Sequence, residues 1–202
     1  MIAIVDYGVG NLFSLKSSFA AIGYPAEVTG DSTRIRSAGK VILPGVGAFE
    51  DAAKKLRDTG LDSAVKDAAK AGKPLLGICL GMQMLFDKSL EYGEHQGLGL
   101  INGTVEPIEG VIPGGLKIPH IGWNALHLYG ESPIFKYTKE GDCVYFVHSY
   151  YGTTYAENVI ADTEYGAPLT AAVQSGNVFG CQFHPEKSGA VGLDILRAFC
   201  EI

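Results

Sequence analysis

The residue best suited to act as a nucleophile is Cys79, in the segment PLLGICLGMQMLF. An apolar run predicts a buried strand before it, and a helix is predicted after it, so the cysteine occupies a sharp turn between the two. Gly77 and Gly81 flank this turn, which needs small neighbours. The turn would present the sulfur at the carboxyl edge of a sheet, where the start of a helix favours the thiolate. Most free cysteines are inert, and we interpret Cys143 and Cys200 in that way.

A thiol nucleophile usually needs a base, and the base needs a group that orients it. The segment VFGCQFHPEKS supplies His184 and Glu186, two residues apart. Pro185 between them favours an extended backbone at the histidine, which would direct both side chains to the same side. A lone histidine is more often structural; we interpret His95 and His127 in that way, and the same interpretation is open for His120. The preceding strand is expected to end at the same sheet edge as the cysteine, so we predict a Cys-His-Glu triad.

A glycine-rich loop in VILPGVGAFED follows another apolar run. Acyl transfer needs backbone N–H groups that point at the developing oxyanion. One predicted donor is the amide of Leu80, directly after the nucleophile. The second is expected from the loop at Val46 and Gly47, because glycine neighbours allow a peptide to reorient. By itself this motif would equally fit a plain turn before a helix.

The elements that must position these residues follow an alternating pattern in the first half of the chain. Apolar runs separated by amphipathic segments indicate a parallel sheet covered on both faces by helices. The expected strands are IAIV (2–5), 26–29, KVIL (40–43) and PLLGIC (74–79), and the expected helices are 11–23, with Asn11 as a candidate cap, 49–58, 61–71 and 80–90.

The second half has a different character. From Gly97 onward, segments rich in β-branched and aromatic residues alternate with turns, which predicts short and largely antiparallel strands. The chain closes with an amphipathic segment, 190–202, in which Leu193, Leu196, Ala198 and Phe199 can face a core. Without a repeat or linker, we expect residues 1–202 to form a single α/β domain with a mixed, mostly parallel central sheet.

Bulk composition excludes several classes of function. The 202 residues are 47% hydrophobic and 19% charged, which is typical of a globular domain with a buried core. The formal net charge of −6 argues against nucleic acid as a partner, because phosphate binding needs a basic surface. Four cysteines without C-x-x-C spacing indicate neither a metal site nor a disulfide framework. No signal peptide or membrane-spanning run is apparent, so we expect a cytoplasmic protein that needs no cofactor and no membrane.

Taken together, these motifs resemble the class I, triad-type glutamine amidotransferases. G-x-C-x-G-x-Q and H-P-E are typical of that family in general. DYGVGNL, LPGVGAF, KIPHIGWN, YFVHSYY and FHPEKSG extend the resemblance along the whole chain. Within the family, they are similar to the glutaminase subunits of imidazole glycerol phosphate synthase.

The resemblance implies a flavodoxin-like fold, an activity and a partner. Such a subunit hydrolyses glutamine to glutamate and ammonia, and the ammonia passes to a (β/α)8-barrel cyclase subunit in a heterodimer. The cyclase makes imidazole glycerol phosphate and an aminoimidazole carboxamide ribotide in histidine biosynthesis. The resemblance also implies substrate-binding roles for Gln83, Glu91, His148, Ser149 and Tyr150, and a partner interface at Asn11, His120, Trp123 and Lys187.

Without the resemblance, most of these residues have simpler interpretations. Gln83 could be an exposed helix residue, Glu91 a surface charge and Trp123 a core residue. Two other classes of protein also fit the motifs. One is a different triad enzyme on the same scaffold, such as a stand-alone hydrolase or an amidotransferase subunit serving pyridoxal phosphate synthesis. The other is a binding subunit that has lost the chemistry, although the intact triad argues against it.

Overall fold

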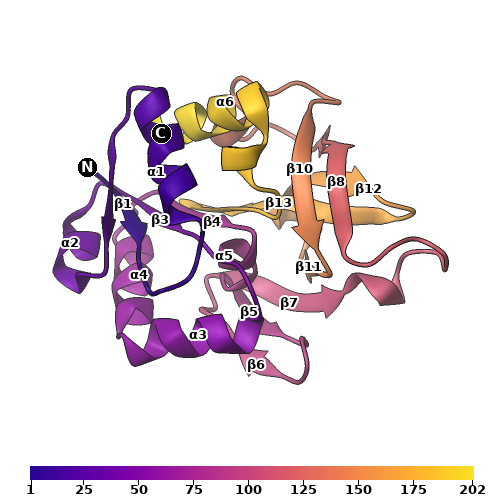
Figure 1. The fold of residues 1–202 in the computed structure, drawn as a ribbon, viewed down its shortest axis with the longest axis horizontal. Helices are drawn as coiled ribbons and strands as arrows, with labels where there is room; N and C mark the ends of the chain where they lie inside the picture. Colours follow the sequence, from indigo (N-terminus) through magenta and orange to yellow (C-terminus); the bar gives the residue numbers. More distant parts are fainter.

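The computed structural model describes residues 1–202 and is organised around one eight-stranded sheet (Figure 1). Its strand order is β2-β1-β3-β4-β14-β13-β12-β9. The first five are parallel: β2 (Ala26–Thr29), β1 (Ile2–Val5), β3 (Lys40–Leu43), β4 (Leu75–Ile78) and β14 (Val178–Cys181). The last three continue it in antiparallel fashion: β13 (Pro168–Ser175), β12 (Val159–Glu164) and β9 (His127–Leu128). The predicted mixed, mostly parallel sheet is confirmed.

Helices cover both faces of the parallel part of this sheet, as predicted (Figure 1). They are α1 (Leu12–Ala21), α2 (Ser32–Ser37), α3 (Phe49–Asp58), α4 (Leu61–Lys70), the single turn α5 (Leu80–Gln83) and α6 (Gly189–Cys200). Val41 and Leu75 point into the apolar cluster that α2, α3 and α4 share. Ile42 and Leu76, one position further along each strand, point into the cluster shared with α1 and α6. The two-residue period of a strand thus produces two cores. None of the helices is both long and apolar enough to cross a membrane.

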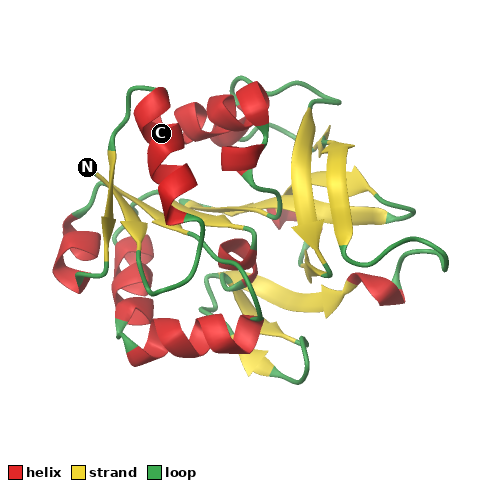
Figure 2. Cartoon of the chain, viewed as in Figure 1, coloured by secondary structure: helices red, strands yellow, loops and turns green.

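The second half of the chain is rich in strands, as expected (Figure 2). Two smaller sheets stand beside the main one. The first pairs β8 (His120–Ala125) with β10 (Cys143–His148) in antiparallel fashion. The second has the order β11-β7-β5-β6 and contains β11 (Tyr150–Thr153), β7 (Ile101–Pro107), β5 (Phe86–Ser89) and β6 (His95–Gln96).

The helix predicted over residues 80–90 is wrong beyond Gln83. The chain leaves the helix after one turn and forms β5, which pairs in parallel with β7. Phe86 is fully buried, and its ring occupies the space in which a side chain at Gly152 would stand. Asp87 accepts a hydrogen bond from the backbone N–H of Gly103 at 2.9 Å. These tertiary contacts outweigh the local helical pattern.

Three local features also differ from expectation. The side chain of Asn11 makes no capping hydrogen bond at α1. Helix α2 was not predicted, although Asp31 caps it by accepting a hydrogen bond from the N–H of Thr33 at 2.8 Å. In α6, Leu193 is only half-buried, whereas Ile195 is fully buried in the core.

Candidate active site

Cys79 occupies a strained elbow between β4 and α5. Its φ of 54° and ψ of −113° lie outside the regions that most residues with a side chain adopt. The turn needs glycine on both sides of Cys79, because both positions lie so close to other backbone atoms that a side chain would not fit. A Cβ at Gly77 would stand 2.7 Å from the carbonyl oxygen of Gly81, and a Cβ at Gly81 would overlap the carbonyl oxygen of Leu43. The predicted nucleophile turn is therefore confirmed in its geometry.

Parallel pairing brings the segment that contains His184 and Glu186 beside this elbow. Strand β14 lies next to β4, with Cys181 opposite Ile78, and the backbone N–H of Cys79 donates to the carbonyl of Cys181 at 2.8 Å. The chain then continues directly to His184 and Glu186. The prediction that both segments end at one sheet edge is confirmed.

His184 and Glu186 form a buried pair. The Nδ1 atom of His184 lies 2.9 Å from Oε1 of Glu186, and the two side chains are 3% and 1% exposed. Their contact was predicted, but not its local cause. Pro185–Lys187 form a 3₁₀ turn rather than an extended strand, and His184 alone has an extended backbone. The turn, not a two-residue strand period, brings the carboxylate back to the imidazole.

The surroundings of His184 favour its charged form. Burial lowers the pKa of this imidazole, but hydrogen bonding to Cys79 and Glu186 outweighs burial and raises the pKa to about 9. A histidine with that pKa is protonated at neutral pH. The site is therefore suited to a thiolate–imidazolium pair, with Glu186 stabilising the imidazolium.

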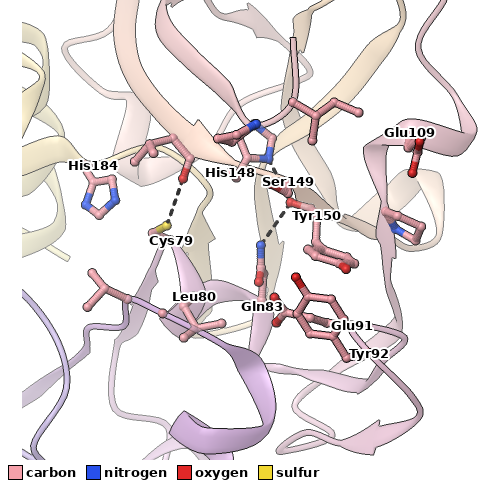
Figure 3. A pocket seen from close by; sticks show the side chains of 16 residues that line it. Cys79, Leu80, Gln83, Glu91, Tyr92, Glu109, His148, Ser149, Tyr150 and His184 are labelled. Carbon is pink, nitrogen blue, oxygen red and sulfur yellow. Dashed lines mark hydrogen bonds between the residues drawn. The ribbon is translucent and has the colours of Figure 1, made fainter. Parts of the chain in front are cut away.

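A cavity of about 560 Å³ is lined by Cys79 (Figure 3). Ten of the predicted site residues line it: Val46, Gly47, Cys79, Leu80, Gln83, Glu91, His148, Ser149, Tyr150 and His184. Glu186 does not line the cavity, since its side chain is only 1% exposed, and it contacts the lining residue His184 instead. The fold therefore brings together the triad, the glycine-rich loop and the residues expected to hold a substrate.

Gln83 is buried, so the alternative of an exposed helix residue is wrong. Its Nε2 donates to the carbonyl oxygen of Tyr150 at 3.1 Å (Figure 3). The same Nε2 donates to Oε1 of Gln182 at 3.0 Å. Both amide hydrogens are thus used within the protein. Its own Oε1 is left as the atom that can accept a hydrogen bond from a ligand.

The ring of His148 also bonds to the protein. Its Nδ1 donates to the Tyr150 carbonyl at 2.8 Å, and its Nε2 lies 3.0 Å from Nδ1 of His120. Burial lowers the pKa of His148 to about 4, although the bond to Tyr150 opposes this. A neutral ring with both nitrogens occupied cannot bind a substrate carboxylate. Any such role for residues 148–150 belongs to their backbone.

Glu91 is a half-buried carboxylate at the edge of the cavity rather than a free surface charge. Its Oε2 accepts a hydrogen bond from the backbone N–H of Phe49, the first residue of α3, at 2.6 Å. Burial raises the pKa of Glu91, while the bond from Phe49 and the nearby His95 oppose that shift. One oxygen is thus anchored to the end of the glycine-rich loop, and the other remains for a cationic group.

The residues predicted at a partner interface divide into two groups. Trp123 is 55% exposed, so its alternative as a core residue is wrong, and Lys187 is exposed with its Nζ 5.9 Å from the ring centre of Tyr145. Asn11 is half-buried. For His120 the structural interpretation is confirmed, because its side chain is fully buried and stacked on Tyr165. His120 supports the fold from within instead of offering a surface.

One residue at the nucleophile was not predicted. Gln182 is fully buried, and its Nε2 lies 3.7 Å from Sγ of Cys79. It directly follows β14, whose last residue is Cys181, and stands two positions before His184. A search for polar residues at two-residue spacing from the histidine would have found it.

An elbow cysteine beside a buried histidine–carboxylate pair is the arrangement of enzymes that use a cysteine nucleophile. Comparison with known proteins makes the class specific. The model of the family described as glutamine amidotransferase class-I matches residues 3–201. The chain therefore belongs to the class I glutamine amidotransferase family.

Curated relatives match over the full length. The chain is 48% identical to imidazole glycerol phosphate synthase subunit HisH of Caldanaerobacter subterraneus subsp. tengcongensis, covering 100% of this chain and 98% of that protein. It is 45% identical to the protein of the same name in Oceanobacillus iheyensis, covering 100% and 99%. Among solved structures, one described as PurLQS from Thermotoga maritima superposes with a TM-score of 0.77 over 99% of this chain and 97% of that one. At 21% identity, the last likeness shows a shared fold only.

Proposed function

We propose that this chain hydrolyses glutamine to glutamate and ammonia through Cys79, His184 and Glu186, and delivers the ammonia to a (β/α)8-barrel cyclase. The observation that carries the proposal is the strained elbow cysteine beside an imidazole with a raised pKa. Family membership and the names of the full-length relatives support the choice of glutamine and of imidazole glycerol phosphate synthase.

The reaction has two steps. The Cys79 thiolate attacks the side-chain carbonyl carbon of glutamine, and the C–N bond breaks as ammonia leaves with a proton from His184. This step forms a γ-glutamyl thioester. His184, now neutral, takes a proton from water, and the resulting hydroxide attacks the thioester carbonyl. Glutamate leaves and the thiolate is restored, so His184 acts first as an acid and then as a base.

The oxyanion formed in both steps needs N–H donors. We assign these to the amide of Leu80 and to the loop at Val46 and Gly47, all of which line the cavity. A Cβ at Gly45 would stand 2.6 Å from the backbone nitrogen of Gly81, so the loop begins in direct contact with the elbow. The φ of 89° at Gly47 suits a peptide that can reorient at little cost.

The opposite side of the cavity is suited to the amino-acid end of the substrate. The Oε1 of Gln83 and the outer oxygen of Glu91 would accept hydrogen bonds from the α-ammonium group. The backbone amides of residues 148–150 would hold the α-carboxylate. All of these groups line the same cavity as Cys79, which supports the proposal that one small ligand could meet them together.

We assign the partner interface to the exposed face of β8 and the adjoining residues. Ile121 and Trp123 are 57% and 55% exposed, and large exposed apolar side chains commonly mark a docking surface. Lys187 and Asn11 complete the proposed interface. The four cysteines are free, which suits a reducing compartment, and we place the protein in the cytoplasm.

Covalent labelling tests the nucleophile. A glutamine-like diazo-ketone should add its mass to the peptide that contains Cys79, and the Cys79→Ala variant should stay unlabelled. Labelling at Cys143, Cys181 or Cys200 in place of Cys79 would refute the assignment.

A second experiment tests ammonia delivery. The complex with the co-purified cyclase should lose its glutamine-dependent product when it carries Cys79→Ala, yet still form product from ammonium salt at high pH. We expect the isolated wild-type chain to hydrolyse glutamine slowly, because a loop peptide that presents its carbonyl would remove one oxyanion donor, at a cost of about 10²–10³ in rate. Equal glutaminase rates with and without partner and cyclase substrate would instead support a stand-alone hydrolase.

A further inference from the structure

A chain of side-chain amides runs beneath the cavity to the sulfur of Cys79. Gln182 is fully buried and does not line the cavity. Its Oε1 accepts a hydrogen bond from Nε2 of Gln83 at 3.0 Å, and its Nε2 lies 3.7 Å from the sulfur. Gln182 thus lies between Gln83, which lines the cavity, and Cys79, yet the two-step reaction described above gives it no role.

The orientation of each amide in this chain is dictated by a backbone carbonyl. The oxygen of Tyr150 can only accept, and it receives hydrogen bonds from Nδ1 of His148 at 2.8 Å and from Nε2 of Gln83 at 3.1 Å. Gln83 must therefore present N–H groups to both Tyr150 and Gln182. Because Gln182 must then accept with its oxygen, its nitrogen faces Cys79. A flipped Gln182 would place two N–H groups against each other.

The partners of the sulfur differ between its two protonation states. The carbonyl oxygen of Val147, 3.9 Å from Sγ, can accept from a thiol but offers nothing to a thiolate. The Nε2 of Gln182 has the opposite character, because an N–H group donates best to an anion. Unlike His184, the amide does not titrate, so it remains a donor at every working pH.

We propose that Gln182 is a further catalytic residue, a fixed hydrogen-bond donor that stabilises Cys79 as the thiolate. The inference rests on the proposed role of Cys79 as nucleophile. It also connects the sulfur to the substrate side of the cavity, since the amide that aligns Gln182 belongs to Gln83. A change that releases Gln83 from the Tyr150 carbonyl would allow Gln182 to turn its oxygen toward the sulfur.

The test is the pH dependence of alkylation by iodoacetamide, measured on the full chain by mass spectrometry of the peptide containing Cys79. Gln182→Met keeps the length of the side chain and removes the N–H donor. We expect the midpoint of its profile to move up by about 0.5–1 pH unit, which is a loss of about 3–10-fold in rate below the midpoint. The exposed Cys143 in the same molecule is the internal control, and its profile should not move.

Gln182→Leu is the second variant, and it should shift the profile in the same direction if Gln182→Met folds poorly. Thermal melting of both variants shows that the folded protein is being measured. A Gln182→Met or Gln182→Leu profile that coincides with the wild type, on a Cys79 that remains reactive, would overturn the inference alone. A wild-type Cys79 that reacts no faster than Cys143 near neutral pH would instead overturn the proposed nucleophile.

Discussion

The Glu186→Gln substitution isolates the charge of the triad carboxylate from its geometry. Oε1 of Glu186 accepts from His184 at 2.9 Å, and an amide oxygen in the same place can also accept. Oε2 makes no hydrogen bond, so an amide nitrogen there breaks no existing one. The variant should therefore keep the imidazole in place while removing a buried negative charge.

The expected effect follows from the pKa of His184, which is raised from 6.5 to about 9. Hydrogen bonds to charged groups contribute about 1.5–3 kcal/mol, and one pKa unit corresponds to about 1.4 kcal/mol. Loss of the charge should lower the pKa by about 1–2 units. The imidazolium persists below its pKa and is lost above it, so a lower pKa moves the alkaline limit of activity down by about 1–2 pH units.

The assay is glutamate release from pH 5.5 to about 10 in the presence of the partner subunit. A matched control exists on the surface, where His127 Nδ1 lies 2.6 Å from Oε1 of Glu140 in an exposed pair. Glu140→Gln changes the same kind of histidine–carboxylate contact at a pair that does not line the cavity, and it should leave the profile unchanged. Glu186→Gln should also retain more activity than Cys79→Ala, because an orienting residue is less essential than the nucleophile. An alkaline limit that stays at its wild-type pH in Glu186→Gln would refute the reasoning.

Two further substitutions test the elbow and the substrate site. Gly81→Ala forces a Cβ onto the Leu43 carbonyl and should lower the free energy of unfolding, measured by denaturant titration, by about 1–3 kcal/mol or more. The control is Gly110→Ala, where a Cβ meets open space, and it should change the free energy of unfolding by less than about 0.5 kcal/mol. Equal stabilities would contradict the close packing of the elbow. Glu91→Gln should raise KM for glutamine by about 10–100-fold, because a charged hydrogen bond to the substrate is lost. Glu94 lies outside the cavity, so Glu94→Gln should leave KM unchanged. A KM that is unchanged in both variants would show that Glu91 does not belong to the site.

Much of the fold could be predicted from the sequence because its strands are short apolar runs that end at glycine, proline or aspartate. The parallel core and its covering helices follow from that pattern. The prediction failed at residues 80–90, where the helical spacing is real but Phe86 packs against Gly152 from a distant strand. No local pattern contains that contact. The short helix α2 was missed although its Asp31 cap was visible in the sequence.

The candidate site was predicted unevenly for a similar reason. Cys79, His184 and Glu186 stand in compact motifs whose spacing reflects a turn or a neighbouring contact. The burial of His120 depends on residues from other segments: its ring is stacked on Phe146 and Tyr165 and lies tilted against His148. A sequence motif indicates that such a residue is special but not which way its side chain points.

The strain at Cys79 connects the fold to the chemistry. A residue with a side chain in such a backbone conformation costs about 1–3 kcal/mol and persists only where its surroundings hold it. Here β14 holds it through the Cys79 N–H to Cys181 carbonyl bond, and β3 holds it through the close approach of Leu43 to Gly81. The elbow is thus a property of three adjacent strands rather than of its own motif. Changes that loosen either neighbouring strand should therefore reduce the reactivity of Cys79 before they unfold the protein.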